Sequence, residues 1–221
     1  MWEHILIVFW TDFKKQILAL DYWIKILALL AGTGLITALA WPSIQPYQFK
    51  APVVGIYYSY ALLIAIVYLN TIALGSRSNK ELLTMGEWKY YGSFSNLEIV
   101  MGKAFSTIVI TFVSICTTIP VGCLMTFIAS LTWHNLISLY LNLLILGVAC
   151  SWLSIYLEDI KNEWPQIAYL EFGLILVFLL VCALVFSLDV LFSFQLSIPL
   201  LLLTLIMLID LALDVRGRFF N

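Results

Sequence analysis

Residues able to carry out acid–base or metal chemistry are few in this sequence, and they are widely separated. The two histidines, His4 and His134, are expected at opposite ends of the helical bundle predicted below, so they cannot share a metal site or a proton relay. We interpret both as bystanders at a membrane boundary. The chain has no G-x-x-x-x-G-K-[ST] phosphate loop, no G-x-S-x-G and no H-E-x-x-H. We therefore expect no catalytic residue, metal or cofactor in this chain, and no enzymatic activity.

Two carboxylates, Glu171 and Asp210, fall inside long apolar segments. An acid at membrane depth is a candidate functional site because its burial is costly. One interpretation is structural, with both acids reaching the nearer membrane boundary or pairing with basic groups such as Lys103 or Arg216. The other is proton coupling. The four cysteines, by contrast, lack the paired spacing of metal or redox sites and are interpreted as packing residues.

The composition indicates that these residues are carried by a membrane protein. Hydrophobic residues make up 63% of the 221 residues and charged residues 11%, against about 45–50% and about 25% in ordinary globular chains. We predict an all-α polytopic membrane protein, a single domain over residues 21–221 with six transmembrane helices. A helix of about 20 residues crosses the hydrocarbon core, and the spans are predicted at about 21–41, 53–74, 97–131, 136–157, 165–187 and 196–213. Residues 188–195 are predicted to dip into the outer side without crossing.

Residues 1–20 precede the first span and have a different pattern. Apolar residues recur at helical spacing, while Glu3, Asp12, Lys14 and Lys15 interrupt them. This pattern predicts an amphipathic helix lying in the membrane interface. The alternative is a frayed extension of the first span. No small-residue cleavage pattern follows, so we expect no cleavable signal peptide.

The distribution of basic residues predicts the orientation. With six spans and both termini in the cytoplasm, only Lys50 of the eleven Lys and Arg residues lies outside. This asymmetry follows the positive-inside rule and predicts a multi-pass protein of a bacterial plasma or inner membrane.

The long polar segment between the second and third spans, residues 75–96, is the part we expect to contact a partner. It contains Gly86-Glu87-Trp88 and leads into Ser95-Asn96-Leu97-Glu98, which matches a helix capping box. A helix should therefore begin there and continue to about residue 131, with Pro120 bending it inside the membrane.

The six-span layout and the ending SFSNLEIVMGK resemble the ABC-2 type permeases, the membrane subunits of ATP-binding-cassette exporters. In that family this region commonly reads G-x-x-E-x-L-L followed by P-[VI]-S-x-x-E-[IVL]-x-x-[GA]-K. Ser95, Glu98, Ile99, Gly102 and Lys103 match the second part, whereas Ser93 stands in place of the family's proline.

The resemblance implies a permease that pairs with a second copy or paralogue and with a separate ATPase, which binds the ATP and Mg. It implies that a helix at about 79–91 docks on that ATPase, with Leu82, Leu83, Met85 and Trp88 as apolar anchors and with a charged rim. The implied coupling residues are Lys80, Glu81, Leu82, Leu83, Glu87, Trp88, Ser95, Glu98 and Lys103.

We expect export of a small amphipathic or lipidic cargo such as a peptide, lipid or drug, without nucleic-acid binding. Three alternatives remain. They are a membrane immunity or assembly protein without transport activity, the substrate-binding subunit of a vitamin importer, and an intramembrane enzyme.

Overall fold

The computed structural model is a bundle of helices and describes residues 1–40, 52–75, 83–128, 132–164, 166–186 and 194–213. Every regular element among these residues is α-helical. The helices are α1 (Trp2–Leu18), α2 (Leu20–Ala40), α3 (Pro52–Gly75), α4 (Met85–Tyr91), α5 (Asn96–Cys116), α6 (Ile119–Ile128), α7 (Trp133–Tyr156), α8 (Glu158–Glu163), α9 (Gln166–Phe186) and α10 (Ser197–Leu213).

Four helices within the described residues, α2, α3, α5 and α7, are long and apolar enough to cross a membrane. The apolar stretches of α6, α9 and α10 are shorter, at Ile119–Ile128, Gln166–Val181 and Ser197–Leu213. The chain is therefore an all-helical protein with the character of a multi-pass membrane protein. Residues 42–51, between the first two predicted spans, and most of the predicted dip at 188–195 lie outside the described residues.

The centre of the bundle is formed by α3, α5 and α7, with α10 against α5 and α7, α9 against α3, and α2 against α3 and α6. Its main apolar cluster is built around Tyr58, Leu62, Ile66, Leu139 and Leu143, all almost completely buried. Side chains on the outer surfaces of α2, α9 and α10 are large and apolar, for example Leu27, Leu174 and Ile206. A surface of this kind is suited to lipid rather than to water.

Small and polar residues allow the central helices to approach closely. A Cβ atom at Gly147 of α7 would lie 2.6 Å from Thr111 Cγ2 and 3.0 Å from Ile66 Cγ2, so no larger residue fits. Beside it, the side-chain oxygen of Asn70 accepts hydrogen bonds from Thr111 (2.9 Å) and Ser151 (2.6 Å). Hydrogen bonds of this kind between helices satisfy polar groups that neither water nor lipid reaches.

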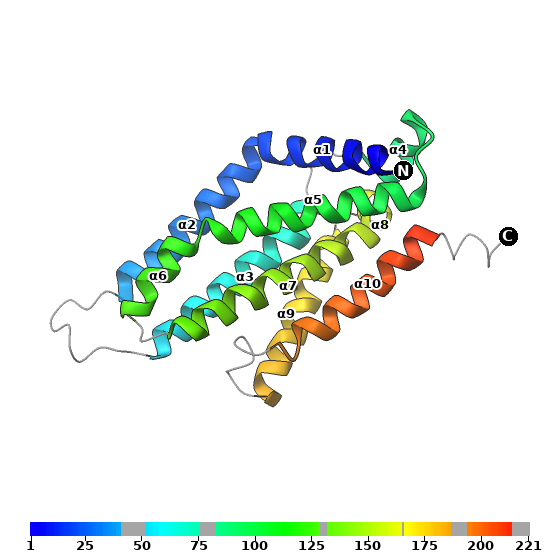
Figure 1. Ribbon diagram of the computed structural model, residues 1–221. Coiled ribbons are helices and arrows are strands. Elements are labelled where there is room, and N and C mark those ends of the chain that lie inside the picture. Colours follow the sequence, from blue (N-terminus) through cyan, green and yellow to red (C-terminus); the bar gives the residue numbers. More distant parts are fainter. Residues whose placement is uncertain (41–51, 76–82, 129–131, 165, 187–193, 214–221) are drawn as a thin grey trace.

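The first two helices are separate. α1 ends at Leu18, and Ala19 has an extended backbone (φ −66°, ψ 124°) before α2 begins at Leu20. Figure 1 shows α1 turning away from the line of α2 and lying along the first half of α5. α1 is therefore a helix of its own and not an extension of α2.

The predicted third span is interrupted. Helix α5 ends at Cys116 and α6 begins at Ile119, with a turn at Thr117 and Thr118. Pro120 lies in the first turn of α6. Because proline has no backbone N–H, the Cys116 carbonyl lacks the hydrogen bond that another residue at position 120 would donate. The predicted bend is present, as a break two residues before the proline.

Candidate functional site

Charged side chains of α1, α4, α5 and α8 gather at one end of the bundle, which we call the polar end. It comprises α1, α4, the first two turns of α5, and α8. Figure 1 places the N-terminus, α4 and α8 together there, with the end of α10 nearby. The candidate site is built from these elements.

Helix α4 is short and is stabilised by its own capping box. Thr84 Oγ1 accepts a hydrogen bond from the Glu87 amide at 3.2 Å, and the Thr84 amide donates to Glu87 Oε2 at 2.7 Å. The hydrogen bond from the Thr84 amide holds the pKa of Glu87 below its usual value. The predicted docking helix, 79–91, is thus helical at Met85–Tyr91, whereas Lys80, Glu81 and Leu82 lie outside the described residues.

The two faces of α4 differ. Met85 and Trp88 are buried in a cluster with Val8 of α1 and with Ile99 and Val100 of α5, and Leu83 packs against the same cluster. Phe94 lies edge-on against Trp88, with ring centroids 5.2 Å apart. The opposite face exposes Glu87, Lys89, Tyr90 and Tyr91.

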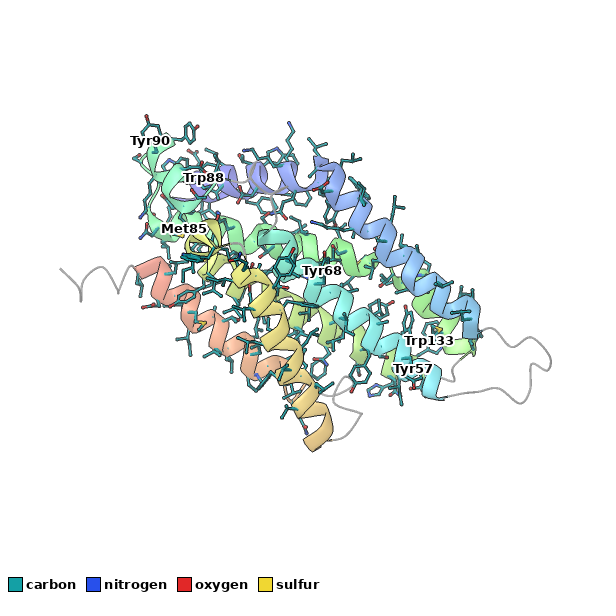
Figure 2. The ribbon with its side chains drawn as sticks, turned by 180° about the vertical axis from the view of Figure 1, so that it is seen from behind. Tyr57, Tyr68, Met85, Trp88, Tyr90 and Trp133 are labelled. Carbon is teal, nitrogen blue, oxygen red and sulfur yellow. The ribbon has the colours of Figure 1, made fainter. Side chains whose placement is uncertain are left out.

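This packing corrects the prediction that Met85 and Trp88 are exposed anchors for a partner. Trp88 is only 4% exposed because α1 and α5 cover it, and it attaches α4 to its own chain. The exposed aromatic residues are Tyr90 and Tyr91, at 88% and 70% exposure. Figure 2 shows Tyr90 projecting from the polar end while Trp88 and Met85 point into the bundle.

Helix α5 begins with the predicted capping box. Ser95 Oγ accepts a hydrogen bond from the Glu98 amide at 3.3 Å, and Glu98 Oε2 accepts one from the Ser95 amide at 2.9 Å. Glu98 is buried and also lies 3.2 Å from His4 Nδ1 of α1. His4 is therefore in contact with a buried acid and with the ring of Phe94, and the bystander interpretation was wrong for it.

One turn further along, Lys103 forms an ion pair with α8. Its ammonium lies 2.6 Å from both Glu158 oxygens, and the lysine side chain is buried. The sequence predicted that Glu171 and Asp210 could pair with basic groups, with Lys103 and Arg216 as examples; Glu171 does pair with a basic group, but not with Lys103. Glu171 of α9 pairs instead with Lys161 of α8, and both side chains are buried. Lys161 Nζ also donates to Ser154 Oγ of α7 at 2.6 Å.

Asp12 of α1 is a further buried acid that the sequence prediction did not select. It is 3% exposed, and its Oδ1 atom has no hydrogen-bond partner among the described residues. Burial raises its pKa to about 7, although the charge of nearby Lys103 opposes this shift. The sequence signal was available, because Asp12 lies four and seven residues after Val8 and Ile5, the residues of α1 that face α5.

The remaining predicted residues lie elsewhere. Asp210 is half-buried in α10, two residues after the buried Leu208 and on a different face of the helix. Arg216 lies outside the described residues. Cys116, Cys123 and Cys150 are free thiols, and Cys150 is buried. Among the described residues, no group of three His, Cys, Asp or Glu side chains could hold a metal ion.

The polar end is thus a set of paired charges and one exposed helix face. Glu98, Lys103, Lys161 and Glu171 each have a partner within the chain, which suits them to hold helices together. The face of α4 that carries Tyr90 and Tyr91 is exposed and could contact another molecule. Comparison of the chain with protein-family models, with curated proteins and with solved structures finds no match.

Proposed function

We propose that this chain is the membrane-spanning permease subunit of an ABC exporter, driven by ATP hydrolysis on a separate ATPase subunit. The exposed face of α4 docks on that ATPase. The cargo proposed from the sequence is a small amphipathic or lipidic molecule, moved outward. The partners are the ATPase and a second copy or paralogue of this permease.

The observation that carries the proposal is the two-sided character of α4. One face carries two exposed tyrosines beside an exposed acid and an exposed base, and aromatic residues with a charged rim are typical of protein–protein contacts. The other face is fixed through Trp88 to α1 and α5. A partner that moved α4 would therefore move the start of a long apolar helix.

The bundle offers a route from α4 into the membrane. Lys103 joins α5 to α8, and Lys161 joins α8 to α9 and to Ser154 of α7. Packed helices joined in this way move as rigid bodies rather than bending continuously. We propose that displacement of α4 reaches α9 by this route and alternates access to the two sides.

The proposed topology has six spans, formed by α2, α3, α5 with α6, α7, α9 and α10, and both termini are cytoplasmic. The proposed coupling residues among the described ones are Glu87, which is exposed, and Trp88, Ser95, Glu98 and Lys103, which hold α4 and the start of α5 in place. Two observations support this topology. The basic residues are distributed strongly to one side, and α4, α8 and the N-terminus lie at one end of the bundle (Figure 1).

The docking face is tested by co-purification of the affinity-tagged permease with Walker-motif ATPases from its own membrane. Truncation of a hot-spot residue, a class enriched in tyrosine, costs at least about 2 kcal/mol of binding, and we propose that Tyr90 and Tyr91 include such a residue. Tyr90→Ala with Tyr91→Ala is therefore expected to lower ATPase recovery by more than about tenfold. The matched control is Tyr57→Ala, since Tyr57 is an exposed tyrosine (66%) at the far end of the bundle (Figure 2).

Two results would contradict the proposal. One is recovery of no ATPase with the wild-type chain. The other is transport or resistance that survives destruction of the recovered ATPase's phosphate loop. Either result would favour the immunity or assembly protein without transport activity.

A further inference from the structure

At the polar end two acids, the buried Asp12 and the partly exposed Glu158, lie near one buried lysine, Lys103. Asp12 of α1 and Glu158 of α8 both lie within electrostatic range of Lys103, so two carboxylates face one ammonium. The other charged side chain near Asp12 is Lys15, on α1 itself. Glu158 holds Lys103 with both oxygens at 2.6 Å.

Asp12 is left in an unfavourable position by this arrangement. Its side chain is 3% exposed, its Oδ1 atom has no hydrogen-bond partner among the described residues, and within those residues no cation lies within ion-pair distance. A buried polar atom without a partner destabilises the fold, and more so when it is charged. An alternative arrangement in which Lys103 turns to Asp12 would transfer this cost to Glu158, which is more exposed.

The two arrangements join different helices. With Lys103 on Glu158, α5 is linked by charge to α8. With Lys103 on Asp12, α5 would be linked to α1, and α8 would keep only its Lys161 contacts with α7 and α9. A long flexible lysine side chain can make such a move without displacing the backbone of α5.

We propose that Lys103 is a switch between two carboxylates, pairing with Glu158 of α8 in one state and with Asp12 of α1 in the other. Each state fixes one of the two helices to α5 and releases the other. A pair of discrete arrangements of nearly equal free energy is what a two-state conformational change requires. The exchange itself needs no ATPase, whereas its use in a transport cycle rests on the proposed function.

The test is hydrogen–deuterium exchange of the full chain in lipid nanodiscs at pH 8, read on peptides covering residues 2–18 and 157–164. Glu158→Gln leaves Lys103 only Asp12, so exchange in α1 is expected to slow and exchange at the Lys161 and Trp164 amides to quicken. Asp12→Asn leaves Lys103 only Glu158 and is expected to slow exchange at the Lys161 and Trp164 amides. A hydrogen bond to a charged group contributes about 1.5–3 kcal/mol, which corresponds to about tenfold or more in exchange rate.

Two controls accompany these variants. Lys103→Met removes the switch and is expected to quicken exchange in both helices, and Asp21→Asn, at an exposed acid of α2, should change neither. A change of pH gives an independent test of the switch. Protonation of Asp12 removes its attraction for Lys103. After division by the intrinsic exchange rate at each pH, the protection of α8 in wild-type protein at pH 5.5 should therefore resemble that of Asp12→Asn at pH 8, while the protection of Asp12→Asn itself changes little between the two values.

The proposal is overturned if Glu158→Gln and Asp12→Asn shift exchange in α8 in the same direction, or if neither variant differs from wild type there. Opposite shifts support it whether or not an ATPase binds. If the shifts are opposite but Tyr90→Ala with Tyr91→Ala changes no ATPase recovery, the switch stands and the proposed docking function fails.

Discussion

The Lys161–Glu171 pair shows how an acid can be accommodated between apolar helices. Both side chains are buried, and Lys161 has Ser154 as a second partner, so each charge is compensated. Such a pair contributes little to net stability compared with apolar residues. Removal of one member, however, leaves the charge of the other buried without a partner. This asymmetry makes the structural and the proton-coupling interpretations of Glu171 testable.

The first prediction concerns this pair. Lys161→Met is expected to destabilise the protein by about 3–5 kcal/mol, because the Glu171 carboxylate is left uncompensated. Lys161→Met combined with Glu171→Leu should recover most of that loss. The measurement is thermal unfolding in detergent, with Lys89→Met, an exposed lysine of α4, as the matched control. A double variant no more stable than the single one would show that the pair is not the source of the effect.

The second prediction follows from the raised pKa of Asp12. In the folded protein this pKa is about 7, against 3.8 for an ordinary aspartate. Well below the unfolded pKa the acid is neutral in both the folded and the unfolded state. Between the unfolded and the folded pKa only the unfolded state releases the proton, so stability falls as the pH rises through this range and levels off above about 7. Asp12→Asn should therefore be more stable than wild type at pH 8, by at most about 4 kcal/mol, and the difference should disappear at about pH 3. A stability difference that does not depend on pH would contradict this assignment.

Sequence patterns identified Glu171 and Lys103 individually but did not identify their partners. Lys161 and Glu158 lie between the predicted spans 136–157 and 165–187. This short segment forms the helix α8, which places the two side chains three residues apart on one helix. Which acid meets which lysine depends on how α5, α8 and α9 pack. No pattern within one segment contains that information.

At the scale of single elements, helix starts were predictable and helix contacts were not. The capping box at Ser95 marks the start of α5 as predicted, and the similar Thr84–Glu87 pattern marks α4, where it was overlooked. Trp88 was interpreted as exposed because it lies in a polar loop. Its burial depends on α1 folding back over α5, which is a contact between segments far apart in the chain.

The contact between α1 and α5 depends on Gly102, and this gives a prediction at the element scale. A Cβ atom there would lie 2.6 Å from Val8 Cβ and 3.0 Å from the Ile5 carbonyl oxygen, and the backbone of α1 cannot move aside without leaving α5. Gly102→Ala is therefore expected to loosen α1 and to quicken hydrogen exchange over residues 2–18. Gly173→Ala is the control, because nothing lies within 4 Å of the added atom. Unchanged exchange in Gly102→Ala would refute this contact.

At the scale of the whole molecule, composition alone determined that the chain is helical and suited to lipid. Composition does not give the number of membrane crossings. Among the described residues, only α2, α3, α5 and α7 are long and apolar enough to cross a membrane. The helices α9 and α10 decide between four and six spans. Both counts are even and place the two termini on the same side, so locating the termini does not distinguish them.

The segment between α9 and α10 does distinguish them, which gives the last prediction. With six spans a cysteine introduced at Asp189 lies outside, on the side of Lys50, whereas with four it lies inside, with Lys89 of α4. Asp189→Cys and Lys50→Cys should therefore react with a membrane-impermeant maleimide added to intact cells, and Lys89→Cys only after permeabilisation. The native cysteines are replaced beforehand. Reaction of Asp189→Cys only after permeabilisation would reduce the bundle to four crossings, and α9 and α10 would then have to be covered by protein or to lie in the interface.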